Sequence, residues 1–243
     1  IHLGIQTDTY DSEGRVTNES DPGDVTLGAV ETALESFRGA IQQTPPMYSA
    51  LKQDGKRLYK LARSGIEVQR EPRSVEIKHL EIGEWRPPYL TLSIVCSRGM
   101  YIRSLAHDLG QSLGCGAHLA QLRRIKTGAF HLDDAITLEE LKEAFDHGDW
   151  EHYLLPPDCA VRHLSTVSIA AEEELQINNG QPARLSPSTH FAQHMETRRA
   201  YNARGVFIGL LRFNKPVRLW QPYKMFRLDA PSPYMADVAM ALR

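Results

Sequence analysis

Apolar residues recur along this chain at two different spacings, and their alternation constrains the fold more than any other feature of the sequence. Residues 90–96 alternate between apolar and polar side chains, which is typical of a strand, whereas residues 102–113 place apolar side chains at helical spacing. The same two spacings predict strands at residues 1–7, 15–17 and 75–85 and a helix at residues 27–37. Strands that come in pairs, with helices between the pairs, predict an α+β fold with a mainly antiparallel sheet.

The chain beyond residue 123 begins with a predicted strand at residues 124–130. Thr137 and Glu140 then have the spacing of a capping box, which predicts a helix that runs to about residue 145. The proline pair within residues 154–158 predicts a linker.

The residues that follow this linker have a different pattern of predicted elements, with short strands and a single helix. A helix is expected at residues 171–177 and short strands at 206–213 and 217–219, which together predict a compact, β-rich domain. We therefore expect one domain over residues 1–158 and a second over 159–229, and residues 230–243 are left without an assignment.

Composition excludes several classes of protein. With 42% hydrophobic residues the chain can build a core, and its apolar runs fall short of the ~18 residues that a membrane-spanning helix needs. The 3 cysteines are odd in number and form no C-x-x-C, which argues against a disulfide framework and fits a reducing cytosol. Cys115 and His118 lack a second pair of ligands at a suitable spacing, so no metal site is predicted. We expect a cytoplasmic protein that has no membrane partner.

The net charge of −2 hides an uneven distribution. Residues 52–126 contain 14 Lys and Arg against 7 Asp and Glu, while the remaining residues are acidic on balance. A basic segment of this kind is compatible with a nucleic-acid partner, although an ordinary solvated surface with ion pairs gives the same count. Charge alone therefore leaves both alternatives open.

Residues 96–105 could carry chemistry because a predicted strand ends there, Gly99 allows a turn, and a helix begins. Tyr101 and Arg103 lie at the mouth of that helix, where a tyrosine could move protons or stack on a base and an arginine could bind a carboxylate. The alternative is a buried tyrosine and a surface arginine with no function beyond the fold.

Residues 114–124 have two glycines near their start and end with a leucine followed by two arginines. The glycines would let a ligand approach the backbone, Leu122 could close an apolar slot, and Arg123 and Arg124 could contact phosphates. The alternative is a glycine-rich connector with an ordinary core leucine.

Residues 47–63 interleave aromatic and basic side chains, which is the combination that single-stranded nucleic acid binds by stacking and phosphate contacts. Many exposed amphipathic stretches have the same composition. The candidates are Tyr48, Lys52, Lys56, Arg57, Tyr59 and Arg63.

Taken together, these segments resemble the TruB-type tRNA pseudouridine synthases. The resemblance covers roughly residues 1–130, and its motifs occur in the order and at the spacing of that family. The matching strings are Thr7-Asp8-Thr9-Tyr10-Asp11, Phe37-Arg38-Gly39, Pro46-Met47-Tyr48-Ser49-Ala50-Leu51-Lys52, Ser97-Arg98-Gly99-Met100-Tyr101-Ile102-Arg103, and the segment from Gly114 to Arg124.

The resemblance implies a pseudouridine-synthase fold followed by a small RNA-binding domain of the PUA kind, with residues 45–70 as a mobile insertion that closes over the RNA. It also implies an activity, the isomerisation of uridine to pseudouridine in the T-loop of tRNA (position 55). In this family the target base is flipped out, an aspartate acts as nucleophile, and no cofactor takes part. The partner would be the T-stem-loop of tRNA, bound by a monomer.

Roles follow from the same resemblance. Arg103 would pair with the nucleophilic aspartate, Tyr101 would lie against the uracil and serve as or orient the base at C5, and Leu122 would pack on the uracil. The contacts to RNA would come from the aromatic and basic residues of the insertion, and Arg123, Arg124 and Lys126 would add contacts to phosphate.

The chain departs from the family in one respect. The nucleophile of the family lies in a Gly-x-x-Asp-Pro-x-Ala-x-Gly loop upstream of the strand with which these residues open, and Asp21-Pro22 lacks the flanking residues of that loop. We therefore expect that the sequence lacks its own N-terminal segment and that the 243 residues are inactive alone. One alternative is a non-catalytic tRNA-binding or RNA-folding module on the same scaffold. Another is a cytosolic α+β protein with no role in nucleic-acid biology.

Overall fold

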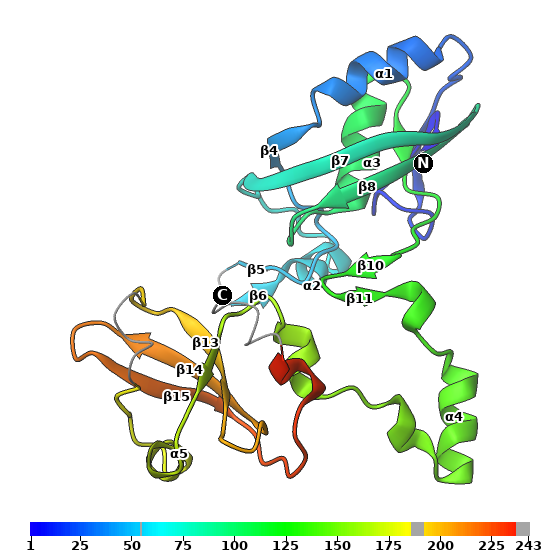
Figure 1. The fold of residues 1–243 in the computed structure, drawn as a ribbon. Coiled ribbons are helices and arrows are strands. Elements are labelled where there is room, and N and C mark those ends of the chain that lie inside the picture. The colour runs from blue at the N-terminus through cyan, green and yellow to red at the C-terminus, as the bar shows by residue number, and fades with distance from the viewer. Residues whose placement is uncertain (54, 186–191, 237–243) are drawn as a thin grey trace. The chain divides into compact units, whose positions relative to one another are not determined.

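The chain folds into two compact units, and each is described by itself. The computed structural model describes residues 1–53, 55–185 and 192–236, and contacts divide the chain into Ile1–Arg123 and Arg124–Arg243 (Figure 1).

The first unit is built on a five-stranded sheet in which all neighbours run antiparallel, as the sequence predicts. Two long strands form its centre, paired from Ile77 opposite Cys96 to Arg86 opposite Tyr89. In order across the sheet, the strands are β4 (Gly39–Gln43), β7 (Arg73–Arg86), β8 (Tyr89–Cys96), β1 (His2–Leu3) and β9 (Ala117–His118).

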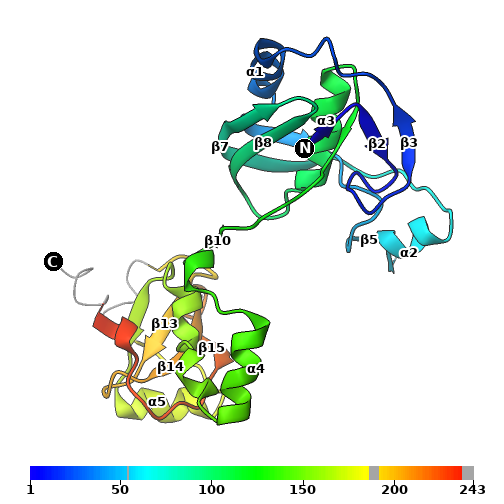
Figure 2. The same cartoon turned by 90° about the vertical axis from the view of Figure 1, so that its right-hand side faces the viewer.

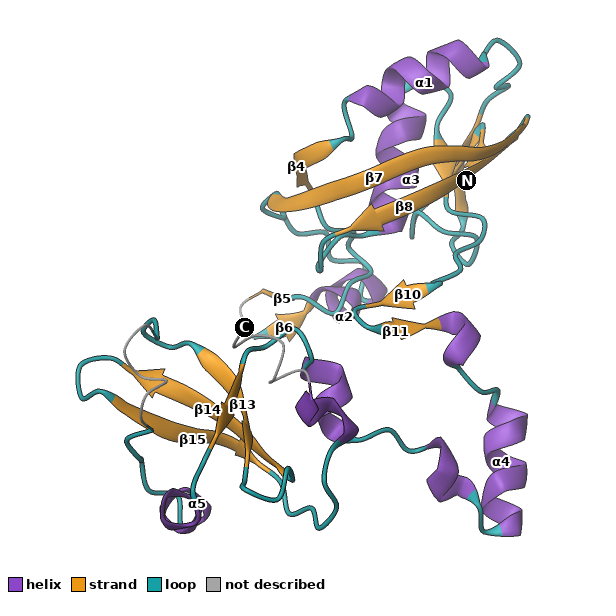
Figure 3. Ribbon diagram, in the orientation of Figure 1, coloured by secondary structure: helices purple, strands orange, loops and turns teal. Residues whose placement is uncertain are grey.

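Two helices share a core with this sheet, and Figure 3 shows both beside β7 and β8. Helix α1 (Leu27–Glu35) begins where the Thr26 hydroxyl accepts a hydrogen bond from the Ala29 N–H, and helix α3 is Ile102–Ser112. Apolar side chains at helical spacing on both helices meet those of the two central strands. The buried cluster is Val30, Leu34, Ile77, Leu80, Leu90, Leu105 and Leu109.

A close backbone contact sets the position of α3. Gly110 is buried, and a Cβ added there would lie 2.2 Å from the backbone nitrogen of Ala117 in β9. Only glycine allows the helix to approach the strand this closely. The contact therefore fixes the helix whose first turn carries Arg103.

The predicted strand over residues 1–7 is broken in two, and this prediction was wrong in its continuity. Gly4 has a φ of +88°, and a Cβ there would lie 2.6 Å from the Ser20 carbonyl oxygen. The chain therefore leaves the main sheet after β1, and β2 (Ile5–Thr7) pairs instead with β3 (Val16–Glu19). The loop between β2 and β3 contains Asp11.

The predicted insertion at residues 45–70 contains a small hairpin and a helix. As its prolines indicate, no helix forms over residues 44–51. The elements are β5 (Lys52–Gln53), β6 (Lys56–Arg57) and α2 (Leu58–Arg63), and residue 54 lies outside the described residues.

The second unit begins with a hairpin rather than the single strand predicted at residues 124–130. Gly128, with a φ of +58°, turns the chain between β10 (Lys126–Thr127) and β11 (Phe130–His131). Helix α4 (Leu138–His147) confirms the predicted capping box, because the Thr137 hydroxyl accepts from the Glu140 N–H while the Glu140 carboxylate accepts from the Thr137 N–H.

A four-stranded sheet forms the rest of this unit, and Figure 2 shows it beside helix α5 (Ala171–Asn178). The predicted strand at residues 217–219 was misplaced: Arg218 turns with a φ of +55°, and the strand follows it. The strands are β12 (Thr166–Ser168), β13 (Thr197–Tyr201), β14 (Phe207–Asn214) and β15 (Leu219–Met225). Short 3₁₀ turns occupy Leu132–Asp134, Trp150–Tyr153, Pro157–Val161 and Pro233–Ala236.

A buried polar cluster closes the second unit. The Asp158 carboxylate accepts hydrogen bonds from the Tyr201 hydroxyl, at 2.7 Å, and from the Ser232 hydroxyl, and Arg199 donates to the Tyr201 oxygen at 3.0 Å. Burial, followed by the bond to Asp158, raises the pKa of Tyr201 well above its usual value. Ser232 belongs to the segment 230–243 that had no assignment, and residues 237–243 of that segment lie outside the described residues.

Candidate active site

The candidate residues Tyr101 and Arg103 lie where β8 ends and α3 begins. Gly99, with a φ of +86°, turns the chain after β8, and Tyr101 is the N-cap residue of α3 in an extended conformation. Arg103 is in the first turn of the helix, and both side chains are partly buried. The strand end, turn and helix mouth expected from the sequence are therefore present.

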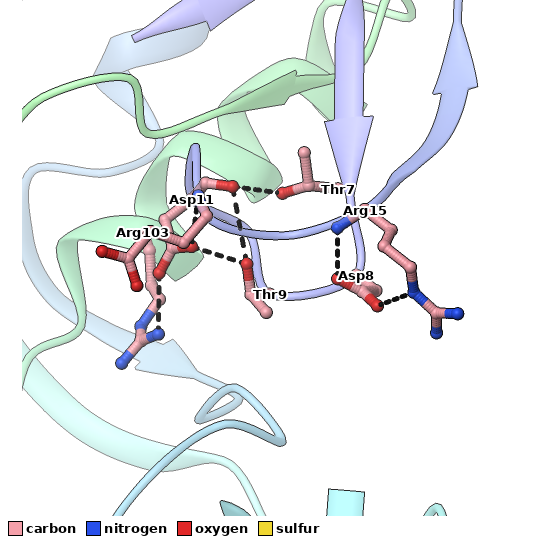
Figure 4. Close-up of polar contacts among 7 residues, drawn as sticks. Thr7, Asp8, Thr9, Asp11, Arg15 and Arg103 are labelled. Carbon is pink, nitrogen blue, oxygen red and sulfur yellow. Dashed lines mark hydrogen bonds and ion pairs between the residues drawn. The ribbon is translucent and has the colours of Figure 1, made fainter. Parts of the chain in front are cut away.

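Arg103 forms an ion pair with a carboxylate of the first unit. Its Nη1 donates to Asp11 Oδ2 at 2.9 Å, and about a quarter of each side chain is exposed, 27% for Arg103 and 24% for Asp11 (Figure 4). A carboxylate partner for Arg103 is expected from the sequence, but its identity as Asp11 emerges only from the structure. The string Thr7-Asp8-Thr9-Tyr10-Asp11 was the available signal, because it matches the family and contains two acidic residues.

The loop between β2 and β3 holds Asp11 in place. The Thr9 hydroxyl donates to Asp11 Oδ1 at 2.5 Å, and the Thr7 hydroxyl donates to the Asp11 carbonyl oxygen at 2.7 Å (Figure 4). In the same loop the Arg15 N–H donates to Asp8 Oδ1 at 2.9 Å. Hydrogen bonds to both the side chain and the backbone of Asp11 fix the carboxylate that faces Arg103.

A ring contact joins the same loop to α3. Tyr10 has a φ of +65°, and its ring stacks on that of His107 with centroids 3.8 Å apart. His107 lies four residues after Arg103, so it is one turn further along the helix. Burial, and then the charge of Arg70, lower the pKa of His107, which favours the neutral imidazole in this stack.

The segment that follows β9 passes beside Asp11. The Leu119 N–H donates to the Tyr10 carbonyl oxygen at 2.9 Å, and the Ser12 N–H donates to the Leu119 carbonyl oxygen at 3.0 Å. Leu122, three residues later, is 60% exposed. Leu122 is therefore not part of the core formed by the described residues, and its contact with a base stays a prediction.

Among the remaining predicted contacts to RNA, the basic residues are exposed and the two tyrosines are partly buried. Tyr59 has the guanidinium carbons of Arg57 and Arg63 within 6.0 Å and 5.6 Å of its ring centroid. Tyr48 is partly buried and near the start of the same insertion. The exposed cations are Lys52, Lys56, Arg57, Arg63 and Arg123, and Arg124 and Lys126 are exposed within the second unit.

Asp108 is a partly buried carboxylate on α3, and burial raises its pKa to about 6. An acid whose pKa is higher in the folded protein than in the unfolded chain binds its proton more tightly when folded. The folded state therefore loses stability as the pH rises from about 4 through about 6, and the loss is complete above that range.

We expect Asp108→Asn to stabilise the protein at pH 8, because asparagine has no charge to desolvate. The expected gain in unfolding free energy is about 1 kcal/mol, discounted for the water that still reaches the side chain. Urea unfolding at pH 8 and pH 4 measures it, and the gain should vanish at pH 4. An equal gain at both values would contradict the titration of Asp108.

The part of the chain that the structure describes contains neither a metal-ligand cluster nor a membrane-spanning helix. Over residues 1–53, 55–185 and 192–236, no three His, Cys, Asp or Glu side chains cluster as metal ligands would. In the same part of the chain no helix combines the length and apolar character needed to span a bilayer.

Comparison with known proteins identifies the family. Residues 1–102 match the family model "TruB family pseudouridylate synthase (N terminal domain)", and residues 103–162 match "tRNA pseudouridylate synthase B C-terminal domain". A protein named tRNA pseudouridine synthase B from Dehalococcoides mccartyi is 41% identical over 231 residues, which is 95% of this chain and 75% of the relative. The chain belongs to the TruB family of pseudouridine synthases.

Further relatives of the same name agree with the assignment to the TruB family. The one from Pseudomonas aeruginosa is 44% identical over 86% of this chain and 68% of its own length, and the one from Geobacter sulfurreducens is 44% identical over 74% and 59%. Uridine-to-pseudouridine isomerisation in tRNA is the reaction that these names describe. The predicted family is thus confirmed.

Solved structures confirm the predicted fold. The chain is similar to a Cbf5–Nop10–Gar1 complex, with a TM-score of 0.57 and 22% identity, over 88% of this chain and 65% of the other. It is also similar to an H/ACA RNP bound to a substrate RNA containing 2′-deoxyuridine, with a TM-score of 0.61, 19% identity and the same coverage. At this level of identity the likeness concerns the fold, which is the pseudouridine-synthase fold.

Proposed function

We propose that the protein isomerises uridine to pseudouridine in the T-loop of tRNA, and that these 243 residues supply part of its site, Tyr101, Arg103 and Leu122, but not the nucleophile. The observation that carries the proposal is the 41% identity to a tRNA pseudouridine synthase B over 95% of this chain. The nucleophilic aspartate would come from a segment outside these residues. The reaction breaks the bond from N1 to C1′ of the sugar, forms the bond from C5 to C1′, releases the proton of C5 and adds a proton to N1.

The geometry around Arg103 supports a second carboxylate. A guanidinium has five N–H donors, and Asp11 engages Nη1. Arg103 can therefore keep its bond to Asp11 and also bind the nucleophilic aspartate. Because Thr9 fixes the Asp11 carboxylate, the guanidinium would be oriented before that second carboxylate or the RNA arrives.

Tyr101 and Leu122 would contact the flipped base. Tyr101, at the start of the helix that carries Arg103, would lie against the uracil and serve as or orient the base that removes the C5 proton. The exposed Leu122 would pack on the uracil ring. Proton transfer through Tyr101 and covalent catalysis by the nucleophilic aspartate need no cofactor.

The RNA would be bound by the basic segments of the chain: residues 45–70 would close over it, and a second group of basic residues would contact its phosphates. Tyr59, between two arginines, would stack on a base, and the exposed lysines of residues 45–70 would contact the backbone. Arg123, Arg124 and Lys126 would add phosphate contacts. Residues 159–229 would form a PUA-like RNA-binding domain, and the protein would act as a cytoplasmic monomer.

Reversing two charges of the insertion, with Lys52→Glu and Lys56→Glu together, should weaken tRNA binding about tenfold or more at low salt. The slope of the logarithm of the binding constant against the logarithm of the salt concentration should also become shallower by about two, because two phosphate contacts are lost. Turnover at saturating tRNA should stay near that of the wild type, since neither lysine touches the candidate catalytic residues. Filter binding over a salt series and single-turnover kinetics measure the two effects.

The control for this pair is Lys78→Glu, an exposed lysine of β7 outside the insertion. It should leave the dissociation constant within about twofold of the wild type. An unchanged dissociation constant in the double variant would contradict a role for these lysines in RNA binding.

Release of tritium from tRNA labelled at C5 of uracil tests the function, with the complete protein as the enzyme. A transcript whose T-loop uridine is replaced by cytidine is the control, and it should release none from that position. Tight binding of tRNA with no release would instead favour a non-catalytic RNA-binding or RNA-folding module. Failure to bind a T-stem-loop at low salt would contradict both.

A further inference from the structure

The side chain of Gln43 bridges the end of β4 to the start of α3. Gln43 is the last residue of β4 and is 3% exposed. Its Oε1 accepts a hydrogen bond from the Tyr101 N–H at 2.8 Å, and its Nε2 donates to the Tyr101 carbonyl oxygen at 3.1 Å. One buried carboxamide thus pairs with both backbone groups of a single residue, as a neighbouring strand would.

The two hydrogen bonds hold the backbone groups that flank the Tyr101 Cα, the N–H before it and the carbonyl after it. Tyr101 is the N-cap of α3, so its N–H precedes the helix and has no donor role within it. Its carbonyl oxygen also accepts the first helical hydrogen bond, from the Leu105 N–H at 3.2 Å. Gln43 therefore supplies the contact that holds Tyr101 in its extended conformation, and removing the amide leaves two backbone groups without that partner.

A second hydrogen bond joins the same elements without touching Tyr101. The buried Ser104 hydroxyl, in the first turn of α3, donates to the Thr44 carbonyl oxygen at 3.1 Å. This bond contributes to the packing of the helix against the end of β4. A variant that lacks only this bond weakens the contact between α3 and the end of β4 but leaves the two bonds to Tyr101 in place.

We propose that Gln43 is a positioning residue for the reaction, acting through the backbone of Tyr101; the role rests on the proposed function. The carboxamide orients the phenol toward the uracil before the RNA binds. Gln43 also lies two residues before Pro45, with which the insertion over residues 45–70 begins. The residue that sets Tyr101 is therefore close in sequence to the segment expected to close over the RNA.

Gln43→Met in the complete protein tests the proposal, because methionine has a similar volume but neither bonds the N–H nor donates to the carbonyl. The rate constant of a single turnover should fall about 10²-fold, as expected for a reactive group displaced by about 1 Å. The dissociation constant for tRNA should stay within about twofold of the wild type. Ser104→Ala, the matched control, should keep the rate constant within about twofold.

Gln43→Glu supplies a second readout that a purely structural role would not move. A protonated glutamic acid can accept from the Tyr101 N–H and donate to its carbonyl, whereas the ionised form has no donor and repels the carbonyl oxygen. The rate of this variant relative to the wild type should therefore recover as the pH falls. Thermal melting at each pH shows whether the protein is folded at the temperature of the assay.

Three outcomes would overturn the inference. If the wild type is active and the rate constant of Gln43→Met is within about threefold of it, the positioning role of Gln43 is excluded while the proposed function stands. Equal rate losses in Gln43→Met and Ser104→Ala show that the junction, and not Tyr101, is what matters. An inactive wild type removes the proposed function and the catalytic role of Gln43 with it.

Discussion

Tyr101→Phe is expected to lower the turnover of tRNA by about 10³-fold, within the range that removal of a general acid or base costs. The substitution removes one oxygen and keeps the ring, so contacts of the partly buried ring to its surroundings and to the uracil are preserved. The backbone of Tyr101 is held by Gln43 and not by its own hydroxyl. The loss should therefore fall on proton transfer and leave the fold intact.

The measurement is single-turnover release of tritium from C5-labelled tRNA, with the dissociation constant determined alongside it. Tyr89→Phe is the matched control, since Tyr89 is a 52% exposed tyrosine of β8, the strand that leads to the junction. It should show no change in turnover. A Tyr101→Phe protein whose melting temperature falls together with its activity would instead indicate a structural role for the phenol.

Arg103→Lys is expected to lower turnover by about 10²-fold or more, although the positive charge is retained. A guanidinium presents a planar set of donors that can engage two carboxylates at once, whereas an ammonium is a compact charge on a flexible stem. Lysine could replace the contact to Asp11 or the contact to the nucleophile, but not hold both in one fixed geometry. Catalysis depends on that geometry more than on the charge.

Stability should change little in Arg103→Lys. About a quarter of each partner in the ion pair is exposed, so the expected loss in unfolding free energy is below about 1 kcal/mol, as urea unfolding would show. Arg15→Lys, in the same loop and 91% exposed, is the control and should leave turnover unchanged. Full activity of Arg103→Lys would show that a point charge suffices there.

Local signals in the sequence predicted the helices well. The Thr137–Glu140 pair begins α4 as predicted, because capping bonds join residues only three positions apart. The period-two pattern of residues 90–96 was equally informative, since β8 packs Leu90, Leu92, Ile94 and Cys96 into the core that the sheet shares with the helices. Such features depend on neighbouring residues and can be predicted without knowing the fold.

Features that depend on distant residues could not be predicted in this way. The break of the first strand at Gly4 reflects the nearby Ser20 carbonyl, and the turn at Gly128 replaced a strand that propensity favoured. The functional site shows the same limit. Asp11 reaches Arg103 across 92 positions and Gln43 reaches Tyr101 across 58, so both partners emerge only from the strand order.

The polar cluster on Asp158 has a consequence for how residues 158–232, the β-rich part of the second unit, could be exchanged between proteins. Asp158 and Ser232 share a hydrogen bond, and the Arg162 guanidinium lies 4.8 Å from the centre of the Tyr234 ring. The points where the chain enters and leaves the β-rich unit are thus side by side. A segment with adjacent ends can be spliced into a host chain, or excised from it, while the flanking chain closes over a short gap. Because the cluster holds these two points together, residues 158–232 have the geometry of a segment that can be inserted into another protein as a unit.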